Sequence, residues 1–272
     1  MPCLNLLDTR LAWVVLDMGS TNDQLKNVVW KTTWGGSFLT LIGTGLFWAG
    51  SQDFKTSNLP WLAGLAYILF LNVCLPVLYF AYRNQSPVWV NGVMGILGGL
   101  VPAAGVLGMG AHFFYFSLAP MPRWVSLVGL VGGTALILHW GYKIACDVMD
   151  ALHSKGLLAQ AYIDADKVYY CDTWSFMQKM DAVQLKRDPF KSYHLWLALA
   201  ITPFAVVLNR FLTPYTGSGH GVFIVLSILG LPMSLWIIGV AVRAYIVMIH
   251  YPLKLQHKTG KPVLMREIQL GP

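Results

Sequence analysis

Residues 61–82 read WLAGLAYILFLNVCLPVLYFAY and contain no charged side chain. A run of about 20 apolar residues is long enough to cross the ~30 Å hydrocarbon core of a bilayer as a helix. Trp and Tyr stand at the ends of this run, as in the aromatic belts of membrane helices. Further apolar windows follow the same pattern at residues 34–50, 88–118, 124–142, 193–212 and 222–242. The sequence therefore predicts an all-α integral membrane protein with six transmembrane helices.

The composition supports this class. Hydrophobic residues make up 56% of the 272 residues and charged residues only 11%, whereas a soluble domain has about 25% charged residues. The net charge of +7 comes from basic residues that stand beside the apolar windows. We interpret this charge as a signal of membrane topology and expect membrane lipids, not nucleic acid, as its partner.

The basic residues are distributed unequally between the two sides of the predicted membrane. Only Lys55, Arg123 and Arg210 lie on one side, and the other sixteen of the 19 lie on the opposite side. The positive-inside rule assigns the richer side, with both termini, to the cytoplasm. We expect the chain in the cytoplasmic (inner) membrane. A re-entrant hairpin in window 88–118 would reverse all that follows, so a single span kinked at Pro102 fits the charges better.

These assignments divide the chain into membrane and cytoplasmic parts. We expect window 124–142 to continue as a helix to His153 and Pro252 to end the sixth helix. The N-terminal arm is predicted to be amphipathic and either to lie in the interface or to pack on the spans. The predicted parts are the arm at 1–33, transmembrane helices 1–4 at 34–142, a helical cytoplasmic loop at 143–191, transmembrane helices 5–6 at 192–251, and a basic tail at 252–272.

The loop contains a candidate docking surface for a partner. Residues 173–187 predict an amphipathic helix whose apolar face consists of Phe176, Met177, Met180 and Val183. A helical hairpin of this size cannot bury such a face by itself. The membrane surface, the tail or another protein subunit is therefore expected to cover it.

Small residues and prolines mark further candidate positions. Pairs of small residues four apart let helices approach closely, and the predicted helix-packing positions are Gly95, Gly99, Ala104, Gly108, Gly132 and Gly133. Prolines inside paired windows of two three-helix halves are typical of the interrupted helices of transporters. These possible transport-path kinks are Pro76, Pro102, Pro203 and Pro232.

Catalytic chemistry is not visible in the sequence. The six windows contain no Asp or Glu, and no arrangement of nucleophile and base or of metal ligands is present, so we predict no catalytic residue, no metal and no cofactor. One alternative remains open. His139 and His194 lie at a similar depth on two windows and are possible ligands of a b-type haem.

The predicted function follows from these features. We expect a non-enzymatic subunit of a larger envelope assembly of the secretion or conjugation type, with partner subunits in the membrane and on the cytoplasmic side. A small-solute transporter or channel with a 3+3 helix arrangement is the alternative. A haem or quinone electron-transfer subunit is the lesser alternative.

Overall fold

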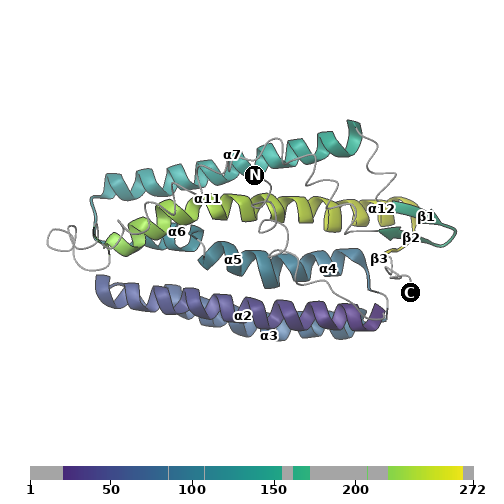
Figure 1. Cartoon of the computed structure of the whole chain (residues 1–272), viewed down its shortest axis with the longest axis horizontal. Coiled ribbons are helices and arrows are strands. Elements are labelled where there is room, and N and C mark those ends of the chain that lie inside the picture. Colours follow the sequence, from purple (N-terminus) through teal and green to yellow (C-terminus); the bar gives the residue numbers. More distant parts are fainter. Residues whose placement is uncertain are drawn as a thin grey trace, which may run out of the picture.

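The computed structural model describes residues 21–84, 86–106, 108–154, 162–171, 207 and 220–265. Its helices run roughly parallel to one long axis, and three short strands lie together at one end (Figure 1). The elements are α2 (Thr21–Phe54), α3 (Leu59–Tyr82), α4 (Val88–Gly95), the π-helix η1 (Ile96–Leu100), α5 (Val101–Val106), α6 (Met109–Leu118), α7 (Arg123–Ser154), β1 (Tyr162–Ala165), β2 (Val168–Cys171), α11 (His220–Ala244), the π-helix η3 (Tyr245–His250), α12 (Tyr251–Thr259) and β3 (Val263–Met265).

Four stretches of helix are long and apolar enough to cross a membrane: Leu59–Tyr82, Val88–Val106, Arg123–His153 and Gly230–Thr259. They correspond to the second, third, fourth and sixth predicted windows, so a helical, membrane-embedded chain is supported. The first window lies inside α2, whose polar first turns run without a break into it. The fifth window, 193–212, lies outside the described residues except for position 207.

The bundle has two distinct ends. At the sheet end, where the strands lie, Leu25 and Val28 of α2 pack with Leu75 of α3. At the opposite end, called the far end below, Phe114 of α6 packs against Phe223 of α11. α2 and α3 are therefore antiparallel neighbours, and α4, η1, α5 and α6 follow one another from the sheet end to the far end (Figure 1).

The last helix continues through Pro252, so the prediction that this proline ends it is wrong. η3 precedes Pro252, which occupies the first turn of α12. A π-turn pairs each N–H with the carbonyl five residues earlier, so the missing N–H of Pro252 leaves the Val247 carbonyl without its backbone partner. The helix ends instead at Gly260, which has a φ of 71° and donates its N–H to Gln256 O at 2.8 Å.

The third window is interrupted at a different place from the predicted kink. Pro102 is the second residue after η1, the same relation that Pro252 has to η3. The helix breaks after Val106, and α6 begins again after Gly108, whose φ is 128°. A residue with a Cβ rarely adopts this backbone conformation. Glycine, and not proline, therefore sets the break.

The sequence predicts a helical loop after α7, but part of this loop forms strands. α7 extends to Ser154, as predicted to within one residue, but residues 162–171 form the β1–β2 hairpin. A content of Tyr, Val and Ile is typical of strands, and a two-residue turn at Asp166 and Lys167 joins the two strands. The tail adds β3 to this hairpin.

Gly108, directly before α6, also lies close to the backbone of α11, and this predicts the effect of a substitution. A Cβ at position 108 would overlap the backbone of Gly230. Gly108→Ala should therefore lower the free energy of unfolding by at least about 2 kcal/mol, through backbone strain and overpacking. Thermal unfolding of the purified protein in detergent measures this change. Gly132→Ala is the matched control, because no described atom lies within 4 Å of its Cβ position; equal melting temperatures for the two variants would contradict the assignment.

Candidate functional site at the sheet end

Three strands from two distant parts of the chain form the sheet. β1 and β2 are antiparallel, and β3 from the tail lies parallel to β2 in the order β1-β2-β3. Tyr162, Cys171 and Met265 are in register across the strands, as are Ile163, Tyr170 and Leu264. Because side chains alternate along a strand, these two rows face opposite sides of the sheet.

The inner face packs against the helices. Tyr162 and Cys171 are buried with Val263 of β3. Their neighbours come from α4, α7 and η3, including Val88 and Val148. Each fully buried side chain of this kind contributes roughly 1.5–3 kcal/mol. Apolar burial therefore fixes the sheet, and with it the tail, to the bundle.

Tyr162 also makes a polar contact inside this apolar cluster. Its hydroxyl donates to the carbonyl oxygen of Val247 at 2.6 Å. This is the carbonyl that Pro252 leaves without a backbone donor. Burial raises the pKa of Tyr162 well above its ordinary value, so the hydroxyl keeps its proton and remains a donor. The hairpin thus completes the hydrogen bonding of the π-turn.

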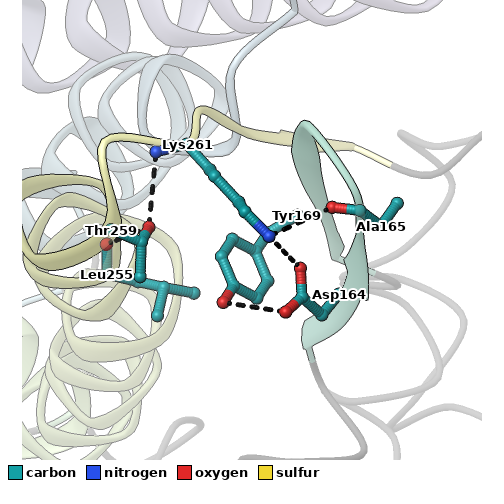
Figure 2. Close-up of polar contacts among 6 residues, drawn as sticks. All are labelled: Asp164, Ala165, Tyr169, Leu255, Thr259 and Lys261. Carbon is teal, nitrogen blue, oxygen red and sulfur yellow. Dashed lines mark hydrogen bonds and ion pairs between the residues drawn. The ribbon is translucent and has the colours of Figure 1, made fainter.

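Lys261 joins the tail to the hairpin (Figure 2). Its Nζ donates to Asp164 Oδ1 at 2.7 Å and to Ala165 O at 3.4 Å, and it lies 5.2 Å from the centre of the Tyr169 ring. The Tyr169 hydroxyl donates to the other carboxylate oxygen of Asp164 at 3.2 Å. The hydrogen bond from Lys261 lowers the pKa of Asp164, and the same bond raises the pKa of Lys261.

The outer face of the sheet presents apolar side chains. Ile163 is 41% exposed and Tyr170 is 38% exposed, and the partly exposed Leu264 completes the row. The predicted docking residues follow this hairpin directly in the sequence but lie outside the described residues; they are Phe176, Met177, Met180 and Val183. The exposed row is an apolar surface at the sheet end that sequence patterns did not reveal.

A second polar group lies between the helices toward the far end. His112 of α6 is buried, and its Nδ1 is 2.6 Å from Ser227 Oγ on α11. Its Nε2 is 3.0 Å from the carbonyl oxygen of Gly129 on α7. A carbonyl only accepts, so Nε2 carries a proton and donates. Both ring nitrogens are thus bonded, and the ring joins three helices.

Further polar contacts surround this crossing. The Tyr115 hydroxyl is 3.1 Å from Nδ1 of the buried His220, at the start of α11. At the helix break, Ser234 Oγ accepts the N–H of Met109 at 3.0 Å and donates to Ala104 O at 3.5 Å. Neither His112 nor His220 is among the candidate residues predicted from the sequence. Gly129 and Gly133 lie opposite His112, and such small residues are the sequence feature that could have indicated a buried histidine.

Of the predicted histidine and proline positions, the structure describes His139, Pro76, Pro102 and Pro232. His139 is exposed on α7, and its proposed haem partner His194 lies outside the described residues. Pro76 and Pro232 lie inside α3 and α11, Pro102 follows η1, and Pro203 is also outside the described residues. Within the described parts of the chain, no group of three or more His, Cys, Asp or Glu residues is placed to hold a metal ion.

The predicted helix-packing residues divide into two groups. A Cβ at Gly108 would overlap Gly230, and one at Gly133 would overlap the His112 ring. Ala104 accepts the Ser234 hydrogen bond at the break. A Cβ at Gly95, Gly99 or Gly132 would meet no described atom within 4 Å.

Comparisons with protein-family models, with curated proteins and with solved structures find no match to this chain.

The contacts of the tail predict how it detaches from the hairpin. Val263→Asp should abolish protection of residues 259–265 from amide hydrogen exchange, because it places a charge in the buried cluster. Lys261→Met should cause a smaller loss, because the Lys261–Asp164 pair is exposed to water. Hydrogen exchange detected by mass spectrometry measures both effects. If Lys261→Met released the tail as fully as Val263→Asp, the ionic contact and not apolar burial would hold it.

The pKa shifts fix the pH dependence of the same contact. The contribution of Asp164 is complete above the ordinary aspartate pKa and is lost as pH falls through its lowered value. The contribution of Lys261 is complete below the ordinary lysine pKa and is lost as pH rises through its raised value. Protection of the tail should therefore be constant between about pH 5 and pH 9 after correction for intrinsic exchange.

Proposed function

We propose that this chain is a six-span, non-enzymatic subunit of a larger membrane assembly. In this proposal, both termini and the sheet lie in the cytoplasm, and the sheet end together with the Phe176–Val183 stripe docks a partner subunit. An envelope assembly of the secretion or conjugation type fits such a subunit. The evidence for each part is given in turn.

The two spans beyond the four described ones have structural support. α2 exposes Trp30 and Trp34 near the sheet end and Trp48 near the far end. Eighteen residues of helix separate Trp30 from Trp48, about 27 Å at 1.5 Å per residue, which is close to the ~30 Å hydrocarbon thickness. Cys171 lies at the sheet end and His220 at the far end. The chain between them connects the two ends, which agrees with a span at 193–212.

The charges of the described ends support the orientation. Lys26, Arg83 and Lys254 belong to the sheet end, whereas Lys55 and Arg123 belong to the far end. Together with the sequence-wide asymmetry, this favours a cytoplasmic sheet end.

The single observation that carries the docking proposal is the apolar outer face of the sheet. α7 has 32 residues, so it is about 48 Å long and extends well beyond a ~30 Å hydrocarbon core. The sheet packs on its last turns, through Val148 and Leu152. The outer row consequently faces either water or a molecule that covers it; this row consists of Ile163, Tyr170 and Leu264. Apolar surface of this kind is typical of an interaction site.

The membrane half of the bundle resembles a scaffold more than a reaction centre. His112 has both nitrogens bonded within the protein, and Ser234 bridges the helix break. The four apolar stretches contain no carboxylate within the bilayer-sized windows, and intramembrane carboxylates are the usual proton relays of carriers.

A transporter or channel is the second candidate, and the broken helix favours it. Discontinuous helices at membrane depth often line transport sites, and α5 and α6 are separated at Gly108. The haem or quinone alternative depends on the untested pair His139 and His194. An absorbance scan of the purified protein distinguishes haem directly.

Sidedness is the first test of the proposal. In a variant without its four native cysteines, a cysteine at Ser57 should react with an impermeant thiol reagent on intact cells. A cysteine at Ser154 should react only after the cells are opened, because it lies at the sheet end. Labelling of Ser154→Cys on intact cells, with Ser57→Cys unlabelled, would reverse the orientation.

Docking is the second test. The double substitution Phe176→Asp with Met180→Asp should leave membrane insertion intact and reduce the size of the complex extracted in mild detergent, as measured by native electrophoresis. The control Lys179→Gln with Asp181→Asn changes the predicted charged face of the same helix and should preserve the complex. A complex of unchanged size in the first variant would reject docking through the stripe.

A further inference from the structure

One face of α2 changes gradually from charged to apolar along the helix. Lys26 is exposed, and Trp30 and Trp34 follow at intervals of four residues with 54% and 67% exposure. Their rings are stacked with centroids 6.2 Å apart. Phe38 and Leu41 continue the exposed face with 64% and 55% exposure. Four residues advance a helix by about 6 Å, so the change from ammonium group to aliphatic side chain takes roughly 20 Å.

α3 repeats this arrangement beside α2. Its exposed face includes Val73, Val77 and Phe80, at 64%, 60% and 64% exposure, and the exposed Arg83 follows at its end. α2 and α3 pack along each other (Figure 1), with Leu25 of α2 in the same buried cluster as Leu75 of α3. Because α2 and α3 are antiparallel neighbours, Lys26 and Arg83 stand at the same end of the pair, each beside exposed apolar side chains of its own helix.

We propose that these exposed faces of α2 and α3 bind an anionic phospholipid. Lys26 and Arg83 bind the headgroup phosphate, since ammonium and guanidinium groups form charge-assisted hydrogen bonds with phosphate oxygens. The stacked Trp30 and Trp34 lie at the level of the glycerol backbone, where indole rings are favoured. An acyl chain lies along Phe38 of α2 and Val73 of α3.

The order of the side chains identifies lipid as the occupant. A phospholipid has its charge, its polar ester region and its hydrocarbon in this sequence along the membrane normal. The exposed face of α2 matches all three parts, and that of α3 matches the charge and the hydrocarbon. On α2 and α3, Asp23 is the one acidic residue at this end, so the basic residues outnumber it and favour an anionic headgroup. The inference requires that α2 and α3 cross the bilayer and does not depend on partner docking.

Native mass spectrometry of the full chain in detergent, titrated with phosphatidylglycerol or phosphatidylcholine of identical chains, tests the proposal. The unchanged protein should bind the first phosphatidylglycerol more tightly than phosphatidylcholine. Lys26→Gln with Arg83→Gln should weaken phosphatidylglycerol binding at least fivefold, the factor that corresponds to about 1 kcal/mol for one basic residue. Phosphatidylcholine binding should remain within twofold.

Lys55→Gln with Arg123→Gln is the matched control, because it removes the same two types of charge from the far end of the bundle. It should leave phosphatidylglycerol binding within twofold of the unchanged protein. Equal weakening by the control and test variants would mean general attraction to a basic protein and would overturn the site. The proposal also fails if neither pair changes binding, or if the unchanged protein does not distinguish the two lipids. Sidedness labelling is independent of these results, so failure here leaves the topology untouched.

Discussion

Where lipid or packed side chains exclude water, no solvent is available for backbone N–H and C=O groups, so the protein must satisfy them itself. The two π-turns make this constraint visible. Each is followed by a proline that lacks the N–H required five residues later: Pro102 after Leu97, and Pro252 after Val247. Tyr67 Oη donates to Leu97 O at 2.8 Å, and Tyr162 Oη donates to Val247 O at 2.6 Å. In both places, a tyrosine hydroxyl therefore supplies the hydrogen bond that the proline cannot donate.

These two hydrogen bonds connect elements that are distant in the chain. Tyr67 ties α3 to η1, and Tyr162 ties the hairpin to η3. At the third irregularity, Ser234 of α11 bonds both sides of the break between α5 and α6. At these three places, a helix that loses its regular hydrogen bonding is thus bonded to another element. Such cross-links favour a scaffold with a defined geometry at the sheet end.

The sequence was most informative where the signal was local. Length and hydropathy located the four apolar helical stretches that the structure describes, and the small residues near position 108 marked a close approach. The break at Gly108 was missed because proline is the familiar helix breaker, whereas Pro102 and Pro252 are tolerated after π-turns that have no recognisable local pattern. The hairpin at 162–171 was missed because its third strand comes from the tail. His112 was missed because its partners, Ser227 and Gly129, meet it only after three helices have packed.

The central claim is that the bundle is a fixed scaffold and not a carrier that alternates between two shapes. Pulsed electron spin resonance tests this in lipid nanodiscs, with one pair of spin labels at Ser57 and Ser117 near the far end and another at Asn84 and Lys258 near the sheet end. All four positions are exposed. The account predicts one narrow distance distribution for each pair. The result that would contradict it is two populations at each end, such that the far-end distance is longer in the state in which the sheet-end distance is shorter. That result would establish the transporter alternative.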